Sequence, residues 1–186
     1  DMTDHGIYGY YGHDASYREA ICWWHETRHG WKIDPSWIFS VHGLVNGTAI
    51  CVDAFTKPGD RVVLFTPIYH SFFRLFEASD REIVQCPLAV ENGRYQMDFD
   101  LYNNMMTGNE RMLILSSPHN PGGRVWSREE LQGVADFAKR HDLIIISDEI
   151  HQDIVYPGRK HIPFTLIDET VNDRLVMMSA TTKTFN

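Results

Sequence analysis

The sequence predicts an α/β fold with a mostly parallel open sheet and helices on both faces. Strand-like and helix-like segments alternate along the chain, which is the pattern of parallel strands joined by helices. Segments 111–116 and 143–147 are apolar throughout, as strands buried on both faces are. The 186 residues are 43% hydrophobic and 23% charged, so one folded domain with a real core is expected.

The elements follow in chain order from their periodicity. Apolar residues at helical spacing and a stop at Gly30 indicate an amphipathic helix over 14–29, capped by Asp14 or Ser16. Later helices are predicted over 46–60, 70–80 and 127–142. Strands are predicted over a larger set of segments, which are 36–43, 61–67, 81–88, 111–118, 143–149 and 174–180.

The composition argues against several classes of function. The formal charge is 17 − 25 = −8, and nucleic acid needs a basic partner surface. Three cysteines without C-x-x-C spacing favour a reducing cytoplasm over a disulfide framework, and we expect no metal site. No apolar run reaches the ~18 residues of a membrane span. The chain lacks a first Met and a signal-peptide layout, so we expect an internal piece of a longer protein.

Polar residues follow two of the buried strands. Asn120 lies between two prolines after 111–118, so its amide is expected to project from the edge of the sheet, although the same sequence also suits a plain turn. Asp148 ends the next strand, where a buried carboxylate is costly without a cationic partner. It is either a helix cap or an acid that keeps a ligand nitrogen protonated.

Three further segments have both a structural and a functional interpretation. The Gly43–Gly47 turn precedes a helix, where backbone N–H groups can meet an anion or form an ordinary turn. Tyr69 is either a core aromatic or a ring laid on a flat cofactor. Lys183 is either a surface lysine or a Schiff-base nucleophile. Together, a phosphate seat, a ring, an amide, a carboxylate and an amine suit pyridoxal phosphate.

At these residues the chain resembles the fold-type I pyridoxal-phosphate enzymes of the class I/II aminotransferase superfamily. The resemblance runs from Tyr8 to Asn186, and four motifs occur in the family's order: KPGDRVVLFTPIYHSF, SSPHNPGGRVWSREEL, IISDEIHQDIVYPGRKHIPF and SATTKTFN. The stretches SDEIHQD, GRKHIPF and TKTFN are most similar to the cystathionine β-lyase-like branch, the MalY/PatB group of C–S lyases.

The resemblance implies a catalytic role for each matching residue. Lys183 would hold the cofactor as a Schiff base and shuttle the α-proton, and Asp148 would pair with the pyridinium nitrogen. Asn120 would donate to the ring hydroxyl oxygen. His151 stands where many relatives place a Tyr for that same oxygen, and Tyr69 would stack on the ring.

The resemblance also implies a phosphate site. Leu44, Val45 and Asn46 would present backbone N–H groups to the phosphate, where many relatives carry hydroxyls. Thr182 would supply one hydroxyl. Relatives often have a Ser three residues before the lysine, but that position is Ala180, which leaves Ser179 as a weaker candidate. Tyr10, or alternatively Tyr8, would reach the phosphate of a neighbouring subunit in a homodimer.

The function implied is that of a C–S β-lyase. It would cleave cystathionine or related cysteine S-conjugates, which are small amino-acid substrates, to a thiol, pyruvate and ammonia. An aminotransferase is the alternative, because both reactions share these residues, and a regulatory or ligand-sensing protein is a weaker one. Residues 1–186 would form the central part of the cofactor-binding large domain, without the small C-terminal domain. Alone, this piece is expected to be inactive and to expose apolar surface.

Overall fold

The computed structural model describes Asp4, Gly6 and residues 15–185. The chain divides into two compact units, Asp1–Ser40 and Val41–Asn186. The first unit contains helix α2 (Ala15–His29), which ends as predicted at Gly30, a residue with a φ of 73°. Trp31 N donates to His25 O at 3.2 Å across this end. The helix stop is therefore confirmed, while Asp14, one of the two predicted caps, lies outside the described residues.

The strand predicted for 36–43 is wrong. A 3-10 helix, Pro35–Trp37, begins the segment, and irregular backbone follows it up to Gly43. The Asp34 side chain accepts a hydrogen bond from Ser36 N at 2.8 Å, and Pro35 occupies the first helical position, where its missing N–H costs nothing. Local capping chemistry therefore overrides the β propensity of the sequence WIFSV.

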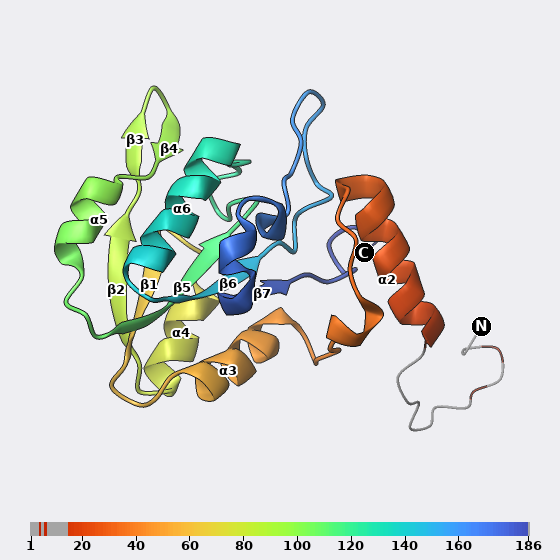
Figure 1. Ribbon diagram of the computed structural model, residues 1–186, viewed down its shortest axis with the longest axis horizontal. Coiled ribbons are helices and arrows are strands. Elements are labelled where there is room, and N and C mark those ends of the chain that lie inside the picture. The colour runs from red at the N-terminus through yellow and green to blue at the C-terminus, as the bar shows by residue number, and fades with distance from the viewer. Residues whose placement is uncertain (1–3, 5, 7–14, 186) are drawn as a thin grey trace. The chain divides into compact units, whose positions relative to one another are not determined.

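The second unit is built on a five-stranded sheet with the strand order β2-β1-β5-β6-β7 (Figure 1). All four strand pairs in this sheet are parallel. The five predicted strands that form it are therefore confirmed, with bounds that differ by at most two residues at either end. They are β1 (Arg61–Thr66), β2 (Glu82–Pro87), β5 (Glu110–Ser116), β6 (Ile144–Asp148) and β7 (Leu175–Met178).

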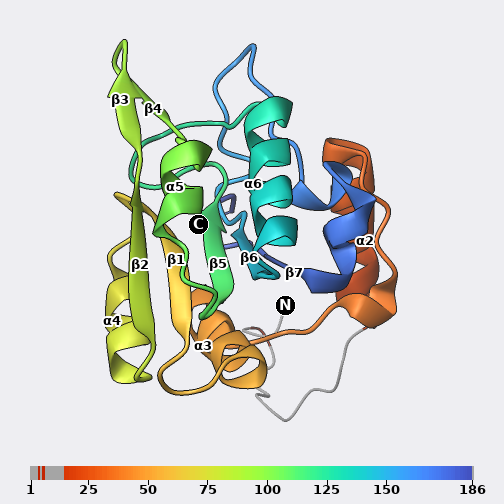
Figure 2. The ribbon, with the colours of Figure 1, turned by 60° about the vertical axis from the view of Figure 1, so that its left-hand side comes forward.

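Helices cover both faces of this sheet, as the sequence predicts. Figure 2 shows α5 and α6 in front of the strands and α3 and α4 behind them. The three helices predicted for this unit are confirmed, and their bounds together with that of α5 are α3 (Leu44–Phe55), α4 (Ser71–Ala78), α5 (Phe99–Met105) and α6 (Arg128–Arg140). None of the helices in the described part of the chain is both long and apolar enough to span a membrane.

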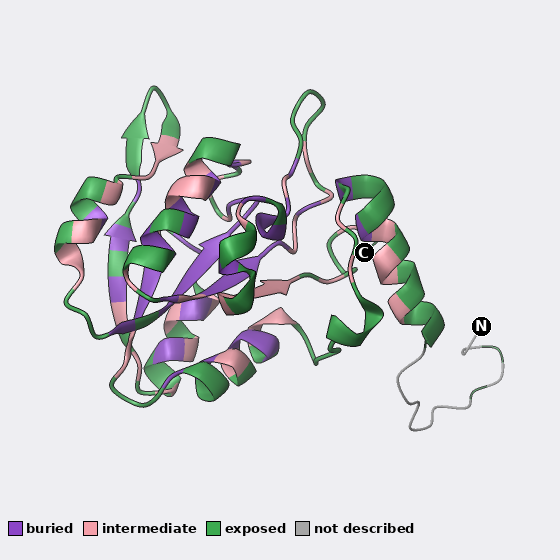
Figure 3. Ribbon diagram, viewed as in Figure 1, coloured by how far each residue is buried: buried purple, intermediate pink, exposed green. Residues whose placement is uncertain are grey.

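Each face of the sheet has its own hydrophobic core. On one face, Val63 and Leu113 pack with α6 residues such as Val134. On the other, Leu64 and Ile114 pack with residues of α3 and α4. Neighbouring residues of one strand therefore enter different cores, which explains why β1, β5 and β6 are buried along most of their length (Figure 3).

Several elements were not predicted. They are the antiparallel hairpin β3 (Ala89–Glu91) and β4 (Arg94–Gln96), the helix α5, and the 3-10 helices Phe164–Leu166 and Glu169–Arg174. Asn92 and Gly93 turn the hairpin with φ angles of 49° and 73°. An Asn-Gly pair favours such tight turns, so this dipeptide was the signal that could have revealed the hairpin.

Candidate active site

Three strand ends form one row at the carboxyl edge of the sheet. Ser116 of β5 pairs with Asp148 of β6, and Asp148 pairs with Met178 of β7. Beyond the pairs, Ser117 N donates to Asp148 O at 2.9 Å and Glu149 N donates to Met178 O at 2.8 Å. Asp148 thus lies within this row, and the segments that follow β5 and β7, which carry Asn120 and Lys183, begin on either side of it.

Asp148 is a buried carboxylate, only 5% exposed. Its Oδ1 accepts a hydrogen bond from Ile150 N at 3.2 Å, the local contact expected of a cap. Within the described residues it forms no ion pair. The pKa of Asp148 is raised to about 6, mainly by burial and to a smaller extent by the neighbouring Glu149 carboxylate, while the hydrogen bond from Ile150 N lowers it. A cationic group placed against this carboxylate would offset both of these increases.

Asn120 lies in a loop that is closely tied to the end of β5. Asn120 N donates to Ser116 Oγ at 3.0 Å, and Trp126 Nε1 donates to Ser116 O at 2.9 Å. Gly123 N donates to His119 O at 2.8 Å, which closes the turn around Asn120. The backbone of Asn120 is therefore fixed one turn beyond the row of strand ends, and its side chain remains partly exposed.

His119 connects this loop to the loop that carries Tyr69. Its Nε2 lies 2.9 Å from Pro67 O, and the ring is 3% exposed. Burial lowers the pKa of His119 to about 4, so the imidazole is neutral near pH 7 and its Nε2–H donates to the carbonyl. Tyr69, two residues after Pro67, is partly buried and meets Phe72 edge-on at a centroid distance of 5.9 Å.

The predicted phosphate turn is the first turn of α3. Gly43 caps the helix with a φ of 84°, in the region that favours glycine, and Gly47 N donates to Gly43 O at 3.0 Å. The helix thus begins at Leu44 rather than at Asn46, and the N–H groups of Leu44, Val45 and Asn46 have no partner within the helix. Such groups attract anions.

Packing brings this helix start close to the row of strand ends. Thr48 Oγ1 lies 3.4 Å from Met178 Sδ, at the end of β7. A Cβ added to Gly47 would contact Val41 at 2.9 Å and Met178 at 3.8 Å, so the first turn of α3 has little room there. The anion-attracting end of α3 therefore lies near the strand that leads to Lys183.

Lys183 lies in an exposed turn beyond β7. Phe185 N donates to Thr181 O at 2.9 Å across this turn, and Thr182 within it is also exposed. Burial lowers the pKa of His151, and the positive charge of Lys183 lowers it further. Lys183 therefore lies within electrostatic reach of His151, three residues after Asp148.

Two predicted residues, Tyr10 and its alternative Tyr8, lie outside the described residues. Two other polar residues at this edge, Gln152 and Asp153, were missed by the sequence reasoning. Ser179 accepts a hydrogen bond from Gln152 Nε2 at 2.9 Å, and Thr184 Oγ1 donates to Asp153 Oδ2 at 2.9 Å. Gln152 and Asp153 belong to the SDEIHQD motif, but only their position in space shows that they contact the lysine segment.

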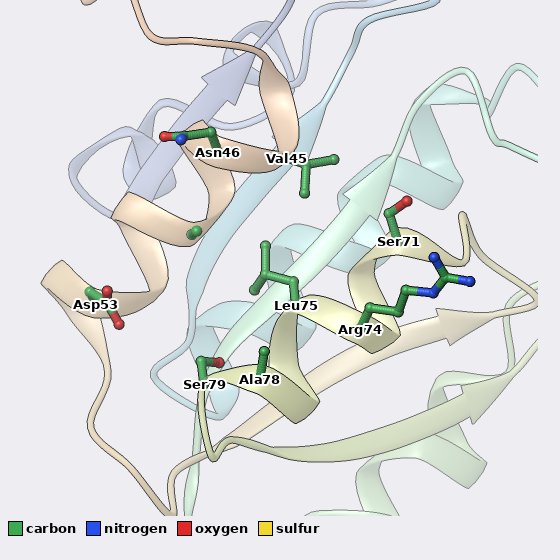
Figure 4. Close-up of a pocket in the computed structure, with 9 residues that line it drawn as sticks. Val45, Asn46, Asp53, Ser71, Arg74, Leu75, Ala78 and Ser79 are labelled. Atoms are coloured by element: carbon green, nitrogen blue, oxygen red, sulfur yellow. The ribbon is translucent and has the colours of Figure 1, made fainter.

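An open groove of about 600 Å³ lies between α3 and α4. Figure 4 shows Val45 of α3 and Leu75 of α4 on its two walls, with Ser71 and Arg74 further along α4. The lining includes Val45 and Asn46 but none of Asp148, Asn120 and Lys183. The groove therefore adjoins the start of α3 and is separate from the row of strand ends.

Comparisons with known proteins identify the family of this chain. A sequence model of the family described as aminotransferase class I and II matches residues 1–186. Cystathionine beta-lyase PatB of Bacillus subtilis is 40% identical over 187 residues, which cover 100% of this chain and 48% of PatB. The family resemblance noted in the sequence is thereby confirmed.

Solved structures show the same fold. Cystalysin from Treponema denticola, which contains a pyridoxal 5'-phosphate cofactor, matches with a TM-score of 0.94 and 38% identity over 99% of this chain and 47% of its own. N-succinyldiaminopimelate aminotransferase from Mycobacterium tuberculosis matches with a TM-score of 0.91 and 28% identity over 99% of this chain and 48% of its own. The chain thus spans about half the length of these relatives.

Proposed function

Since this chain belongs to the aminotransferase class I and II family, we propose that the whole protein is a pyridoxal-phosphate-dependent C–S β-lyase. It cleaves cystathionine or related cysteine S-conjugates and releases a thiol, pyruvate and ammonia. The similarity to cystathionine beta-lyase PatB, at 40% identity, supports the lyase activity. The similarity to cystalysin, which contains the cofactor, supports the cofactor.

The observation that carries this proposal is Asp148. It is a buried carboxylate in register with Ser116 and Met178, and it has no ion-pair partner among the described residues. Pyridoxal phosphate, when bound, supplies an aldehyde that reacts with amines and a protonated ring that withdraws electrons from the α-carbon. The Asp148 carboxylate fits that ring nitrogen, because a cation there offsets the cost of burying the acid.

The other residues of this edge act on the reacting groups. Lys183 would hold the cofactor covalently, and the same amine would serve as the base that takes the α-proton of the substrate. The amide of Asn120 and the imidazole of His151 orient the ring through its hydroxyl oxygen, and Tyr69 covers one face of the ring. The Asn120 backbone is anchored to Ser116 Oγ at 3.0 Å, which supports a fixed position for its amide.

The phosphate is held at the start of α3. The N–H groups of Leu44, Val45 and Asn46 have no helical partner and point out of the helix end, where the helix dipole also favours an anion. Thr182 adds a hydroxyl group. Ser179 is the weaker candidate, since its Oγ already accepts a hydrogen bond from Gln152 at 2.9 Å.

The whole protein works as a homodimer in the cytoplasm, with Tyr10 or Tyr8 reaching the phosphate of the neighbouring subunit. Residues 1–186 form the central part of the large domain, and the small domain lies in the part of the protein beyond this chain. The coverage of 48% of PatB and 47% of cystalysin supports this division.

An aminotransferase is the second candidate, favoured by the similarity to the Mycobacterium tuberculosis aminotransferase at a TM-score of 0.91. One assay separates the two. The full-length protein is given cystathionine, and pyruvate and free thiol are measured; it is then given 2-oxoglutarate with several amino acids. We expect pyruvate and thiol without any need for a keto acid. Glutamate formation without thiol release would replace the lyase by the aminotransferase.

The role of Lys183 has its own test. We predict that Lys183→Ala abolishes the borohydride-reducible adduct between the full-length protein and pyridoxal phosphate, as judged by the mass of the peptide that contains residue 183. Lys160→Ala removes an exposed lysine from the irregular segment that follows β6 and should leave the adduct intact. A stable adduct in Lys183→Ala would show that another amine holds the cofactor.

A further inference from the structure

Lys183 lies in a segment that has little packing of its own. Ser179, Thr181, Thr182 and Lys183 are all exposed, and the strand before them, Leu175–Met178, is only partly buried. Exposed segments with few apolar contacts open at low free energy. A lysine that must meet a bound group at one fixed point therefore needs another source of order.

The turn after Asp148 contacts this segment on both sides of the lysine. Gln152 Nε2 donates to Ser179 Oγ at 2.9 Å, four residues before Lys183. Thr184 Oγ1 donates to Asp153 Oδ2 at 2.9 Å, one residue after it. The turn over residues 149–153 is thus bonded to the chain both before and after Lys183.

This turn is itself firmly anchored. The Glu149 side chain is fully buried, and its Oε1 accepts from Ser147 Oγ at 2.8 Å and from Phe164 N at 3.0 Å. Its Oε2 lies 2.6 Å from His161 Nε2, which is also buried. Within the turn, Gln152 N donates to Glu149 O at 2.9 Å. Gln152 and Asp153 therefore project from an anchored backbone, so their hydrogen bonds can order the segment over residues 179–185.

We propose that Gln152 and Asp153 are positioning residues that hold the Lys183 segment beside Asp148 through their hydrogen bonds to Ser179 and Thr184. The turn over residues 149–153 begins directly after Asp148, and its last two residues hold the segment that carries Lys183. The role in catalysis rests on the proposed function of Lys183, whereas the ordering of the segment does not.

Thr184 offers the cleanest test, because its side chain is only partly buried and its hydroxyl bond can be removed or kept. Thr184→Val removes the donor at nearly constant shape, and Thr184→Ser restores it. Thr170→Val is the matched control, since Thr170 Oγ1 donates to Asp168 Oδ1 at 2.6 Å in a different, exposed part of the fold.

Hydrogen exchange of the full-length apoprotein, followed by mass spectrometry, measures how well the segment over residues 179–185 is ordered in the absence of the cofactor. We expect amides in residues 179–185 to exchange about five-fold faster in Thr184→Val, the effect of losing one hydrogen bond. Thr184→Ser and Thr170→Val should exchange there like the parent protein. Equal exchange in the Val variant and the parent, or equal acceleration in the Val and Ser variants, overturns the proposal.

A second measurement concerns the reaction of Lys183. The rate at which the apoprotein forms a borohydride-reducible adduct with pyridoxal phosphate should fall several-fold in Thr184→Val and recover in Thr184→Ser. An unchanged rate in Thr184→Val, despite faster exchange, overturns the positioning role. Failure of the parent protein to form any adduct overturns the proposed function and the positioning role together, while the exchange experiment still decides whether the turn orders the segment.

Discussion

At the scale of single residues, burial of the Asp148 carboxylate without a cationic partner lowers the free energy of unfolding. Its pKa rises from 3.8 to about 6, mainly through burial. Below pH 3.8 the carboxyl is protonated in both the folded and the unfolded chain, so the cost vanishes. Above pH 6 it is ionised in both, and the folded state carries the full penalty of about 3 kcal/mol.

We therefore predict that Asp148→Asn stabilises the full-length apoprotein by up to about 3 kcal/mol at pH 7.5, because the amide has no charge to bury. The difference should shrink as the pH falls through 6 towards 4. Urea denaturation of both proteins across this range measures it. Asp173→Asn, at a side chain that is 77% exposed, should show no such pH dependence. A difference that grows on acidification would contradict the raised pKa.

His119 is a second case in which one residue carries more than its local sequence indicates. His119 lies between Pro118 and Asn120, in a sequence that predicts only a turn. Its side chain nevertheless hydrogen-bonds to Pro67 O in the loop after β1. The two residues lie 52 positions apart in the sequence and are brought together because β1 and β5 are neighbouring strands. A contact of this kind depends on strand order, which periodicity does not reveal.

At the scale of elements, helix α6 shows agreement between local sequence and tertiary packing. Ser127 accepts from Glu130 N at 3.2 Å, while Glu130 Oε2 accepts from Ser127 N at 2.7 Å, which completes a capping box. Acidic residues occupy the first turn and basic residues the last, in line with the helix dipole. The helix could be predicted for these reasons together with its apolar periodicity.

What the sequence did not show is how closely α6 approaches α5. Gly133 faces Phe99, and a Cβ built on Gly133 would overlap the Phe99 ring. We predict that Gly133→Ala destabilises the protein by about 1–2 kcal/mol, because the overlap outweighs the gain in helix propensity of about 1 kcal/mol. Denaturant unfolding of the full-length protein measures the change.

A second substitution makes this prediction specific. Phe99→Leu removes ring atoms that the new methyl group would meet, so the double variant should lose less stability than the sum of the two single variants. An additive result would mean that Gly133 and Phe99 are not in conflict. A stabilising Gly133→Ala would mean that propensity outweighs packing at this contact.

At the scale of the whole molecule, the sheet separates two cores, but one covering helix is apolar on its outer side as well. Ile50 and Phe55 of α3 are 53% and 47% exposed. Elsewhere Val90 of the β3–β4 hairpin is 65% exposed. Exposed apolar side chains such as these favour association with other molecules. The chain spans only about half the length of its relatives, so these side chains lack any contacts made by the rest of the protein.

We predict that residues 1–186, expressed alone, form no pyruvate from cystathionine and bind a hydrophobic fluorescent dye. Replacing Ile50 and Phe55 by Glu should lower dye binding, because it places charges on the outer side of α3. Val90→Glu, on the hairpin, serves as the comparison and should have a smaller effect. A monodisperse fragment that turns over substrate without binding dye would contradict the prediction.

The fold class, most of the helices and strands, and the family could all be predicted from the sequence. They could be predicted because periodicity, capping residues and strand-end motifs act over a few neighbouring residues. Helix α5 was not predicted, because only Tyr102 of its seven residues is buried and the apolar periodicity is weak. A strand was wrongly predicted for 36–43, where Asp34 and Pro35 favour a 3-10 helix instead.

Which of these segments contact one another depends on the folded arrangement of the sheet. The strand order β2-β1-β5-β6-β7 brings the ends of β5, β6 and β7 into one row, and the first turn of α3 reaches that row through Thr48 and Met178. The structure also shows that Gln152 and Asp153 bond to the chain on either side of Lys183. These contacts join residues 27 to 130 positions apart, and their partners are selected by the packing of the sheet and its helices rather than by any local preference.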